Sequence, residues 1–484
     1  MEEINDLMKV RREKLSSIEA KGQNAYGKKF EVSSTIEDVK STYNADTPIT
    51  VCVAGRVMTW RGHGKALFFD IKDGTGTMQV YTKLNDLEPE SFEALKETDI
   101  GDILGVKGEV FKTRTGEITI KLSQYTLLAK SLRPLPEKWH GLTDVETRYR
   151  QRYVDLIVNP EVMDVFKKRS RIIKEIRSIL DKKGYLEVET PMMQSIPGGA
   201  IARPFKTHHN ALGIDLYLRI APELFLKRLL VGGMEKVYEI NRSFRNEGIS
   251  PRHNPEFTML EAYAAYADYQ DMMDLTEEII CGVAKSVLDT QCLKYQNASL
   301  DLKRPWERLG FHEAIEKYAD VKLDQEKDVP ALAKKLEVKF DPGMIDDAIL
   351  LEIFDEKVEP NLVGPVFIVD YPARLCPLTK IKEGHPDIAE RFELYLGGQE
   401  VANAYSELNH PIIQRDKFEK QIEDHINEGE VKSIDYDYIR ALEYGMPPAG
   451  GLGIGIDRLV MILTNMTNIR DVILFPQMKP EPNE

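Results

Sequence analysis

The chain has 484 residues and a formal net charge of −14, from 65 Lys and Arg against 79 Asp and Glu. This length favours two domains, and the negative charge argues against a general nucleic-acid coat protein without excluding one local basic face. The four cysteines form no CxxC pair, which indicates neither a disulfide framework nor a zinc site. No apolar run reaches the roughly 18 residues of a membrane span, and the acidic N-terminus has no signal-like apolar core. We therefore expect a cytoplasmic protein without a membrane partner.

The first 132 residues predict a helical extension, residues 1–47, followed by a small barrel, residues 48–132. Apolar side chains in residues 2–20 fall on one side of a helix. Basic residues prevail across residues 8–30, which indicates either a solvated face or a contact with an RNA backbone. Residues 133–150 are rich in proline and charge, as expected for a linker into a second domain, residues 151–484.

The barrel prediction depends on five short strands separated by glycine-rich turns within about 85 residues. Five such strands fit a small closed barrel of the oligonucleotide-binding (OB) type. That fold exposes aromatic and polar side chains on one face, where they stack on and bond to unpaired bases. Phe68, Gln79 and Glu117 stand on or beside separate strands of this segment. Taken alone, Phe68 is better explained as a core residue, and the match with the barrel reverses that preference.

The second domain begins with a strongly amphipathic helix. Residues 160–183 hold the i, i+3, i+4 spacing of apolar side chains, and Gly184 closes the helix. Two consecutive glycines, ending at Gly199, allow a ligand to approach the backbone closely. Glu223 stands where a predicted strand gives way to a helix, so it meets either the helix dipole or a ligand cation.

Residues 241–261 predict the end of one strand, a loop and the start of a second strand, together a hairpin with a charged tip. Guanidinium groups suit phosphate oxygens, and an aromatic ring suits a base, so the hairpin has the groups needed to hold a nucleotide triphosphate. A solvated charged hairpin is the alternative. The side chains concerned are Arg245, Glu247, Arg252, His253 and Phe257.

Three further segments complete the second domain. Residues 270–345 are predicted to form a mostly helical, acidic insertion without visible chemistry. Glu393 and Glu400 lie on a predicted strand pair, where they either hold Mg²⁺ against phosphates or form surface ion pairs. Residues 450–466 place glycines directly before Arg458 and an apolar helix, an arrangement that lets backbone and guanidinium meet an anionic ligand.

These segments resemble a known family. The spacing Arg245-x-Glu247 and His253-x-x-x-Phe257-x-x-x-Glu261 is similar to the second signature motif of class II aminoacyl-tRNA synthetases. The helix at 160–183 with its following strand resembles the first motif, and residues 450–466 resemble the third. No P-loop motif occurs.

The order of barrel and catalytic domain resembles subclass b, which handles lysine, aspartate and asparagine, and the form FRNEG resembles its lysine-specific members. The resemblance covers nearly the whole chain. It implies an α+β multidomain protein, with a five-stranded OB barrel before a catalytic domain built on an antiparallel sheet flanked by helices. The first motif implies a homodimer.

The resemblance also implies site residues. Arg245 is expected to hold the ATP α-phosphate and the substrate carboxylate, and Arg458 the terminal phosphates, so both are expected to be catalytic. Glu393 and Glu400 are expected to ligate Mg²⁺. The other ATP-binding residues implied are Glu247, His253, Phe257 and Gly453. Those implied for tRNA anticodon binding are Arg61, Phe68, Gln79 and Glu117.

The amino-acid site implied by the resemblance is acidic. Its residues are Gly199, Glu223, Glu261, Tyr263, Asn403, Tyr405 and Glu407. Gly199 and Glu223 are expected to take the α-ammonium and Asn403 the carboxylate. Tyr263 and Glu407 are expected to close on the ε-ammonium of lysine. Tyr405 departs mildly from the family, where many members have Phe.

A buried carboxylate left unpaired is costly, so an acidic pocket favours lysine over aspartate or asparagine. The expected reaction is activation of L-lysine with ATP to lysyl-adenylate and pyrophosphate, then transfer of lysine to the terminal adenosine of tRNA(Lys). An aspartyl or asparaginyl enzyme is one alternative, and a relative that lysylates a protein lacks the barrel. A catalytically inactive RNA-binding regulator is another alternative, but it would be expected to lack Arg245, Phe257 or Arg458.

Overall fold

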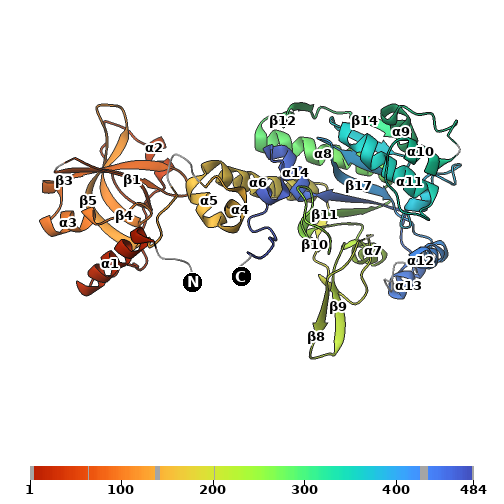
Figure 1. The fold of residues 1–484 in the computed structure, drawn as a ribbon, viewed down its shortest axis with the longest axis horizontal. Helices are drawn as coiled ribbons and strands as arrows, with labels where there is room; N and C mark the ends of the chain where they lie inside the picture. The colour runs from red at the N-terminus through yellow and green to blue at the C-terminus, as the bar shows by residue number, and fades with distance from the viewer. Residues whose placement is uncertain are drawn as a thin grey trace. The chain divides into compact units, whose positions relative to one another are not determined.

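The computed structural model describes residues 5–63, 65–136, 142–200, 202–326, 328–425 and 434–481, with only the backbone for residues 63 and 421–425. The chain divides into two compact units, Met1–Thr143 and Asp144–Glu484 (Figure 1). The unit boundary falls inside the predicted linker, since the first helix of the second unit begins at Val145. Residues 137–141 of that linker lie outside the described part.

The first unit is built on a closed five-stranded barrel in the order β1-β2-β3-β5-β4, which confirms the predicted OB barrel. Its strands are β1 (Thr50–His63), β2 (Ala66–Lys72), β3 (Thr77–Lys83), β4 (Ile103–Lys112) and β5 (Ile118–Ala129). Its helices are α1 (Asp6–Ala20), α2 (Ile36–Ser41), η1 (Leu84–Asp86) and α3 (Pro89–Lys96). Alternate residues of each strand, such as Leu67, Phe69 and Ile71, fill the barrel interior.

The second unit contains an eight-stranded sheet in the order β14-β15-β16-β17-β18-β11-β10-β6. The central pairs are antiparallel, whereas β14–β15 and β10–β6 are parallel. The expectation of an antiparallel sheet therefore holds for the middle of the sheet and not for its two ends. The strands are β6 (Leu186–Glu187), β10 (Lys236–Phe244), β11 (Glu256–Ala265), β14 (Glu307–Gly310), β15 (Val366–Val369), β16 (Arg391–Tyr395), β17 (Glu400–Ser406) and β18 (Ala449–Gly455).

One face of this sheet packs against three helices, α6 (Pro160–Lys182), α8 (Tyr269–Leu288) and α14 (Ile456–Thr464) (Figure 1). The apolar stripe of α6 contributes Ile172, Ile176 and Leu180 to this core, as its spacing predicts. From the sheet, every second residue of the central strands points into the same core. These residues include Leu260, Ala262, Ala402, Ala404, Leu452 and Ile454.

Smaller elements surround the sheet. The helices are α4 (Val145–Arg150), α5 (Arg152–Val158), α7 (Glu223–Val231), α9 (Phe311–Ala319), α10 (Val329–Lys335), α11 (Asp346–Ile353), α12 (Pro411–His425), α13 (Tyr436–Glu443) and α15 (Ile469–Val472), with short turns η2 (Phe354–Val358), η3 (Glu359–Asn361) and η4 (Ala373–Leu375). A three-stranded sheet combines β7 (Met193–Gln194), β9 (Ile214–Leu218) and β8 (Lys206–His209), and β12 (Cys292–Tyr295) pairs with β13 (Ala298–Asp301).

The predicted helical insertion, residues 270–345, differs from the structure. Helix α8 belongs to the main core, β12 and β13 form a hairpin, and β14 is an end strand of the large sheet. Helices α9 and α10 pack into a separate core, which they share with α11, η2 and residues of β14 and β15. The strong amphipathic pattern of α8 fits either location, so the sequence pattern alone did not separate the insertion from the core.

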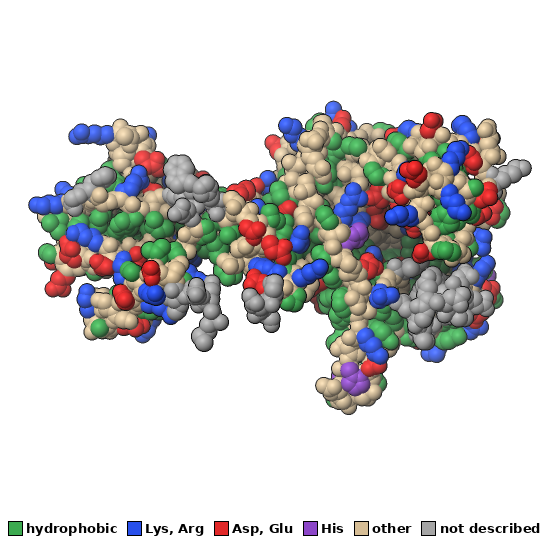
Figure 2. All heavy atoms as spheres, viewed as in Figure 1, with side chains coloured by type: hydrophobic (Ala, Val, Ile, Leu, Met, Phe, Trp, Pro, Cys, Tyr) green, Lys and Arg blue, Asp and Glu red, His purple; other side chains and the backbone are tan. Residues whose placement is uncertain are grey.

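On the visible face of both units, acidic and basic side chains are interspersed (Figure 2). Among the described residues, no helix combines the length and apolar character that crossing a bilayer requires.

Candidate active site

The sheet face opposite the core carries polar side chains in two neighbouring rows. Paired positions across β10, β11, β18, β17 and β16 give the first row: Glu239, Glu261, Gly453, Asn403 and Glu393. The second row, two residues along each strand, comprises Tyr263, Gly451, Tyr405 and Arg391. Because side chains alternate along a strand, both rows point away from the core.

Strand β18 contributes only glycines to these rows, Gly453 to the first and Gly451 to the second, and we call this part of the sheet the glycine floor. A Cβ atom at Gly451 would lie 1.9 Å from Glu407 Oε1, and one at Gly453 would lie 3.1 Å from Met259 Cε. A side chain at Gly451 is therefore excluded, because the Glu407 carboxylate and the Tyr263 ring fill that space, whereas a ligand can approach the strand backbone at Gly453. The glycines predicted to admit a ligand lie in the middle of the site.

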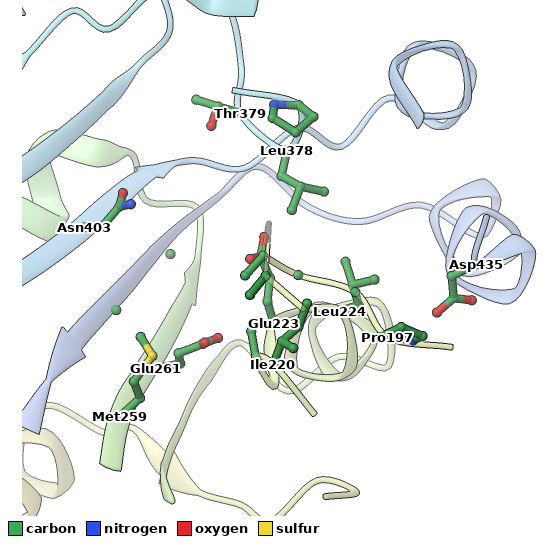
Figure 3. A pocket seen from close by; sticks show the side chains of 18 of the residues that line it. Pro197, Ile220, Glu223, Leu224, Met259, Glu261, Leu378, Thr379, Asn403 and Asp435 are labelled. Carbon is green, nitrogen blue, oxygen red and sulfur yellow. The ribbon is translucent and has the colours of Figure 1, made fainter. Parts of the chain in front are cut away.

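A cavity of about 690 Å³ opens above this floor. Glu261 and Met259 point into it from β11, Asn403 from β17 and Glu223 from α7 (Figure 3). The cavity is also lined by Gly199, Tyr263, Tyr405, Arg245 and Gly453. The cavity thus brings together four predicted segments: the one with Gly199 and Glu223, the hairpin of residues 241–261, the strand with Asn403, and the glycine-rich residues 450–466.

One side of the site is cationic. The Arg245 guanidinium lies 5.1 Å from the centre of the Phe257 ring, and burial lowers the pKa of Arg245. Arg245 Nε is buried and has no hydrogen-bond partner among the described residues. Arg458 donates to Glu400 Oε2 (3.1 Å) and lies 3.1 Å from His253 Nε2. Burial, reinforced by the Arg458 charge, lowers the pKa of His253, so His253 is neutral at physiological pH.

Arg245 and His253 belong to the predicted hairpin, whereas Arg458 lies on α14. Strands β10 and β11 pair from Lys236–Ala264 to Phe244–Glu256, and the loop between them carries Glu247 and His253. Arg252 does not contact this cluster but pairs with Glu359 at 2.5 Å. The alternative of a wholly solvated hairpin is wrong for Arg245, which lines the cavity.

Glu393 and Glu400 lie on the neighbouring strands β16 and β17. Glu393 accepts hydrogen bonds from the hydroxyls of Tyr371 (2.8 Å) and Tyr395 (2.7 Å) and pairs with Arg391. Burial and the nearby Glu393 charge raise the pKa of Glu400, while Arg458 opposes the shift. A bound cation would relieve this repulsion, so the two carboxylates fit Mg²⁺. Among the described residues, no three His, Cys, Asp or Glu side chains form a metal-binding group, so phosphates and water would complete the coordination.

The opposite side of the site is acidic. Glu223 begins α7, as predicted, and its Oε1 accepts a hydrogen bond from the Tyr405 hydroxyl (2.5 Å). Glu261 Oε2 accepts one from the Tyr263 hydroxyl (2.9 Å). Burial raises the pKa of Glu261 to about 8, and the Glu223 charge adds to the shift. Both carboxylates are nearly inaccessible to solvent.

Gly199 and Asn403 border the acidic side. Gly199 has a φ of +89°, and a Cβ there would lie 3.0 Å from Glu223 Cβ, so a side chain would be both strained and crowded. Asn403 Oδ1 is buried without a hydrogen-bond partner among the described residues. An unpaired buried amide oxygen is costly, so it indicates a group supplied by a ligand.

Glu407 is wholly buried against Gly451, on the same face of the sheet as the cavity, but it is not among the residues that line the cavity. It pairs with the ammonium of Lys227. The sequence analysis missed Lys227, because a Lys227-Arg228 pair on a helix is usually solvent-facing. No spacing signal in the sequence distinguished Lys227 from Arg228.

On the barrel, the predicted RNA-binding residues share one outward face. The pairing Arg61–Phe68–Tyr81 crosses β1, β2 and β3, with Gln79 two residues from Tyr81. The Phe68 and Tyr81 rings are 4.7 Å apart, and Gln79 Oε1 accepts from Thr119 Oγ1 (3.1 Å). Glu117 is exposed just before β5. Because Phe68 faces outward, the core alternative for it is wrong.

Tyr81 is a further candidate on this face that the sequence analysis missed. Its signal was the alternation along β3, where the flanking Val80 and Thr82 are buried and Tyr81 is not.

The chain is similar to known families over most of its length. Residues 144–479 match the family of class II tRNA synthetases (D, K and N), and residues 51–128 match the OB-fold nucleic acid binding domain.

Individual relatives are similar along the whole chain. The lysine–tRNA ligase of Pelotomaculum thermopropionicum is 58% identical over 485 residues, which is 99% of this chain and 96% of the relative. That of Carboxydothermus hydrogenoformans is 58% identical over 483 residues, 99% of each chain. That of Clostridium botulinum is 51% identical over 490 residues, 100% of this chain and 97% of the relative.

Proposed function

The chain belongs to the class II tRNA synthetases (D, K and N), and from this premise we propose that it is an ATP-dependent lysine–tRNA ligase. The protein activates L-lysine with ATP in the cavity and transfers it to tRNA(Lys). The observation that carries the amino-acid choice is the acidity of the pocket. Relatives at 51–58% identity over nearly the full chain, all lysine–tRNA ligases, support the same choice.

The acidic side of the cavity selects a cationic amino acid. Glu223, Glu261 and Glu407 lie near one another, and the ammonium of Lys227 contacts two of them. Two carboxylate charges are thus left over, and lysine brings two ammonium groups. Aspartate or asparagine would leave these buried charges unpaired, at a cost of about 3–5 kcal/mol per broken pair. An aspartyl or asparaginyl enzyme is therefore disfavoured.

The amino acid and ATP occupy opposite sides of the glycine floor. The α-ammonium is bound by Glu223 beside Gly199, and the carboxylate accepts hydrogen bonds from Asn403 Nδ2 and Arg245. The ε-ammonium is bound by Tyr263 and Glu261 at the cavity wall, with Glu407 behind them. Phe257 stacks on the adenine, Arg458 covers its other face, and His253 and Arg458 meet the terminal phosphates together with Glu247. The backbone at Gly453 lies beneath the nucleotide.

The reaction requires positioning and charge neutralisation more than acid–base catalysis. The lysine carboxylate oxygen attacks the α-phosphorus in line, forming lysyl-adenylate as the bond to pyrophosphate breaks. Arg245 stabilises the charge on the α-phosphate, and Arg458 stabilises the leaving pyrophosphate. A hydroxyl of the terminal adenosine then attacks the lysyl carbonyl, and AMP leaves. Arg245, Phe257 and Arg458 are all present, which argues against an inactive regulator.

Mg²⁺ is the metal that Glu393 and Glu400 suit. When bound there it would neutralise the phosphate charge, with phosphate oxygens and water as its other ligands. The hydrogen bonds from Tyr371 and Tyr395 orient Glu393 for this role.

The barrel face of Arg61, Phe68, Gln79 and Glu117 binds the tRNA anticodon. Phe68 supplies a stacking surface, and Gln79 and Glu117 supply polar groups for base edges.

The protein acts as a homodimer through the end of the large sheet formed by α6 and β6. Leu186 of β6 is 54% exposed there, and the outer edge of β6 is unpaired among the described strands. All four cysteines are free, which fits the reducing cytoplasm.

Lysine-dependent ATP–pyrophosphate exchange without tRNA tests the proposed function, with aspartate and asparagine as controls. Exchange with lysine alone is the expected result. Exchange with aspartate or asparagine would contradict the pocket-charge argument, and absence of exchange with all three would overturn the ligase proposal.

A further inference from the structure

Lys227 lies one helical turn after Glu223 on α7, and its ammonium has no solvent exposure. Its Nζ is 2.6 Å from Glu223 Oε1 and pairs with Glu407 Oε2. It also lies 5.4 Å from the centre of the Tyr405 ring, whose hydroxyl donates to the same Glu223 oxygen. Lys227 therefore connects a carboxylate at the cavity wall with one that is hidden behind it.

The charge on Lys227 is strongly stabilised. Burial alone would lower the pKa of a lysine, but Glu223 and Glu407 outweigh burial and raise the pKa of Lys227 above its ordinary value. The cation is thus a permanent part of the pocket. Tyr438 on α13 also faces this group, and its buried hydroxyl has no hydrogen-bond partner among the described residues.

An ordinary structural ion pair would need one carboxylate for one ammonium. Here three carboxylates, those of Glu223, Glu261 and Glu407, surround the one ammonium of Lys227. This excess is unexpected for a purely structural ion pair, because burying each unpaired carboxylate is costly. The ion pair of Arg219 with Glu239 at 2.7 Å, which faces Glu261, is internally balanced. The titratable and charged groups around Lys227 are Glu223 and Arg228 on α7, Glu261 and Tyr263 on β11, Tyr405 and Glu407 at β17, and Tyr438 on α13. Arg228 is itself paired with Asp435 at 2.7 Å.

We propose that Lys227 is a positioning residue that sets the charge of the amino-acid pocket and thereby its selectivity for substrates with two ammonium groups. Lys227 compensates one of the three carboxylate charges and holds Glu223 and Glu407 in place. The two remaining charges match the α- and ε-ammonium groups of lysine. This inference rests on the proposed function, because it concerns the same amino-acid site.

The selectivity follows from counting charges. Norleucine, which has the length of lysine without its ε-ammonium, would leave one buried carboxylate uncompensated and is rejected. Without Lys227 even lysine would leave one carboxylate charge uncompensated. Glu223 and Glu407 would then take up a proton more readily, and lysine would bind well only at a higher pH.

Lys227→Gln tests this role, since glutamine removes the charge while keeping a hydrogen-bonding side chain of similar shape. In pyrophosphate exchange we expect the lysine KM to rise at least about tenfold and the ATP KM to change less than about twofold. The pH at which the lysine KM is lowest should move upward. Lys236→Gln is the matched control, because Lys236 is an exposed cation on β10, against which α7 packs. Its constants should equal those of the wild type.

A folded Lys227→Gln variant with an unchanged lysine KM and pH profile would overturn the assignment. If the variant is unfolded at pH 8, circular dichroism at pH 6 decides the matter. Recovery of the fold at pH 6, where the excess carboxylates are protonated, would support charge balance, whereas an unfolded chain at both pH values would assign Lys227 a purely structural role.

Different results would overturn the ligase proposal and the proposed role of Lys227. Absence of lysine-dependent exchange in the wild type would overturn the ligase proposal and this inference with it. Exchange in the wild type with unchanged constants in Lys227→Gln would overturn the role of Lys227 alone.

Discussion

Arg169 on α6 and Asp457 at the start of α14 form a buried ion pair with an N–O distance of 2.6 Å. Asp457 Oδ2 also accepts a hydrogen bond from the Thr258 amide (2.6 Å), and Arg169 donates to Thr258 Oγ1 (3.1 Å). The pair thus connects the helix of the proposed dimer interface with the immediate neighbours of Phe257 and Arg458.

Arg169→Met is expected to lower the free energy of unfolding by about 3 kcal/mol, because it leaves Asp457 buried and unpaired. The rate of pyrophosphate exchange should fall more than the ATP KM rises, because Arg458 loses its support. Urea denaturation and exchange kinetics measure both effects. A double variant with Asp457→Asn should recover part of the stability, and simple addition of the two losses would contradict direct coupling.

Arg245→Ala is expected to lower the rate of adenylate formation by about 100- to 1000-fold or more, because a preorganised cation at the α-phosphate is lost. The fold should survive, since the guanidinium contacts a ring and the cavity rather than the core. Pyrophosphate exchange and circular dichroism measure the two outcomes. Retained exchange in the variant would remove Arg245 from the catalytic role.

Glu407→Gln is expected to raise the lysine KM far more than the ATP KM, by about tenfold or more, because one carboxylate charge near the ε-ammonium is lost. The pairing of Glu407 with Lys227 makes this effect electrostatic rather than a loss of direct contact. Exchange kinetics with each substrate varied in turn provide the comparison. Equal effects on both KM values would contradict a role in lysine recognition.

Lysine affinity is expected to fall as the pH drops below about 8, by up to about tenfold per pH unit, because Glu261 must lose its proton to pair with an ammonium. Burial raises the pKa of Glu261 to about 8 in the empty site. Between roughly pH 4.5 and 8 the folded state therefore holds a proton that the unfolded chain releases, and the contribution of Glu261 to stability declines as pH rises through this window.

Lysine should offset this loss, so the lysine-induced rise in Tm should be larger at pH 8.5 than at pH 6.5. Thermal unfolding with and without lysine measures the difference. Glu261→Gln should show little dependence on pH, and an equal rise in the unmodified protein at both pH values would count against the assignment.

Phe68→Ala is expected to raise the tRNA KM in aminoacylation about 5- to 100-fold, since stacking on one base contributes about 1–3 kcal/mol. Exchange without tRNA should be unaffected, because Phe68 belongs to the barrel unit. Tyr81→Ala should give a smaller effect, as Tyr81 supports the Phe68 ring from the side. A change in tRNA-free exchange would indicate that Phe68 acts on folding rather than on tRNA.

Elements that are determined by the pattern of their own residues could be predicted from the sequence, whereas features that depend on distant residues could not. The barrel strands, α6 and the hairpin of β10 and β11 follow from periodicity, because each buries one face of a regular element. The strand after α6 was predicted, but its parallel pairing with β10 was not, and the four-residue strand β14 carries too little pattern to be predicted.

Within the site, Glu223 and the glycines of β18 were located by their positions at element ends and by their lack of side chains. Lys227 could not be located, because its burial depends on Glu407, which is 180 residues away in the chain. The place of Glu407 against Gly451 likewise depends on the pairing of β17 with β18.

That pairing has one more consequence. Along β11, β17 and β18, residues of the cavity alternate with residues of the core, so a slip of one residue would exchange Glu261 with Leu260 and Asn403 with Ala402. A chain misregistered here would lose its core and its site together. Conformations that are stable enough to survive cellular proteolysis are therefore also those in which the active site is correctly assembled.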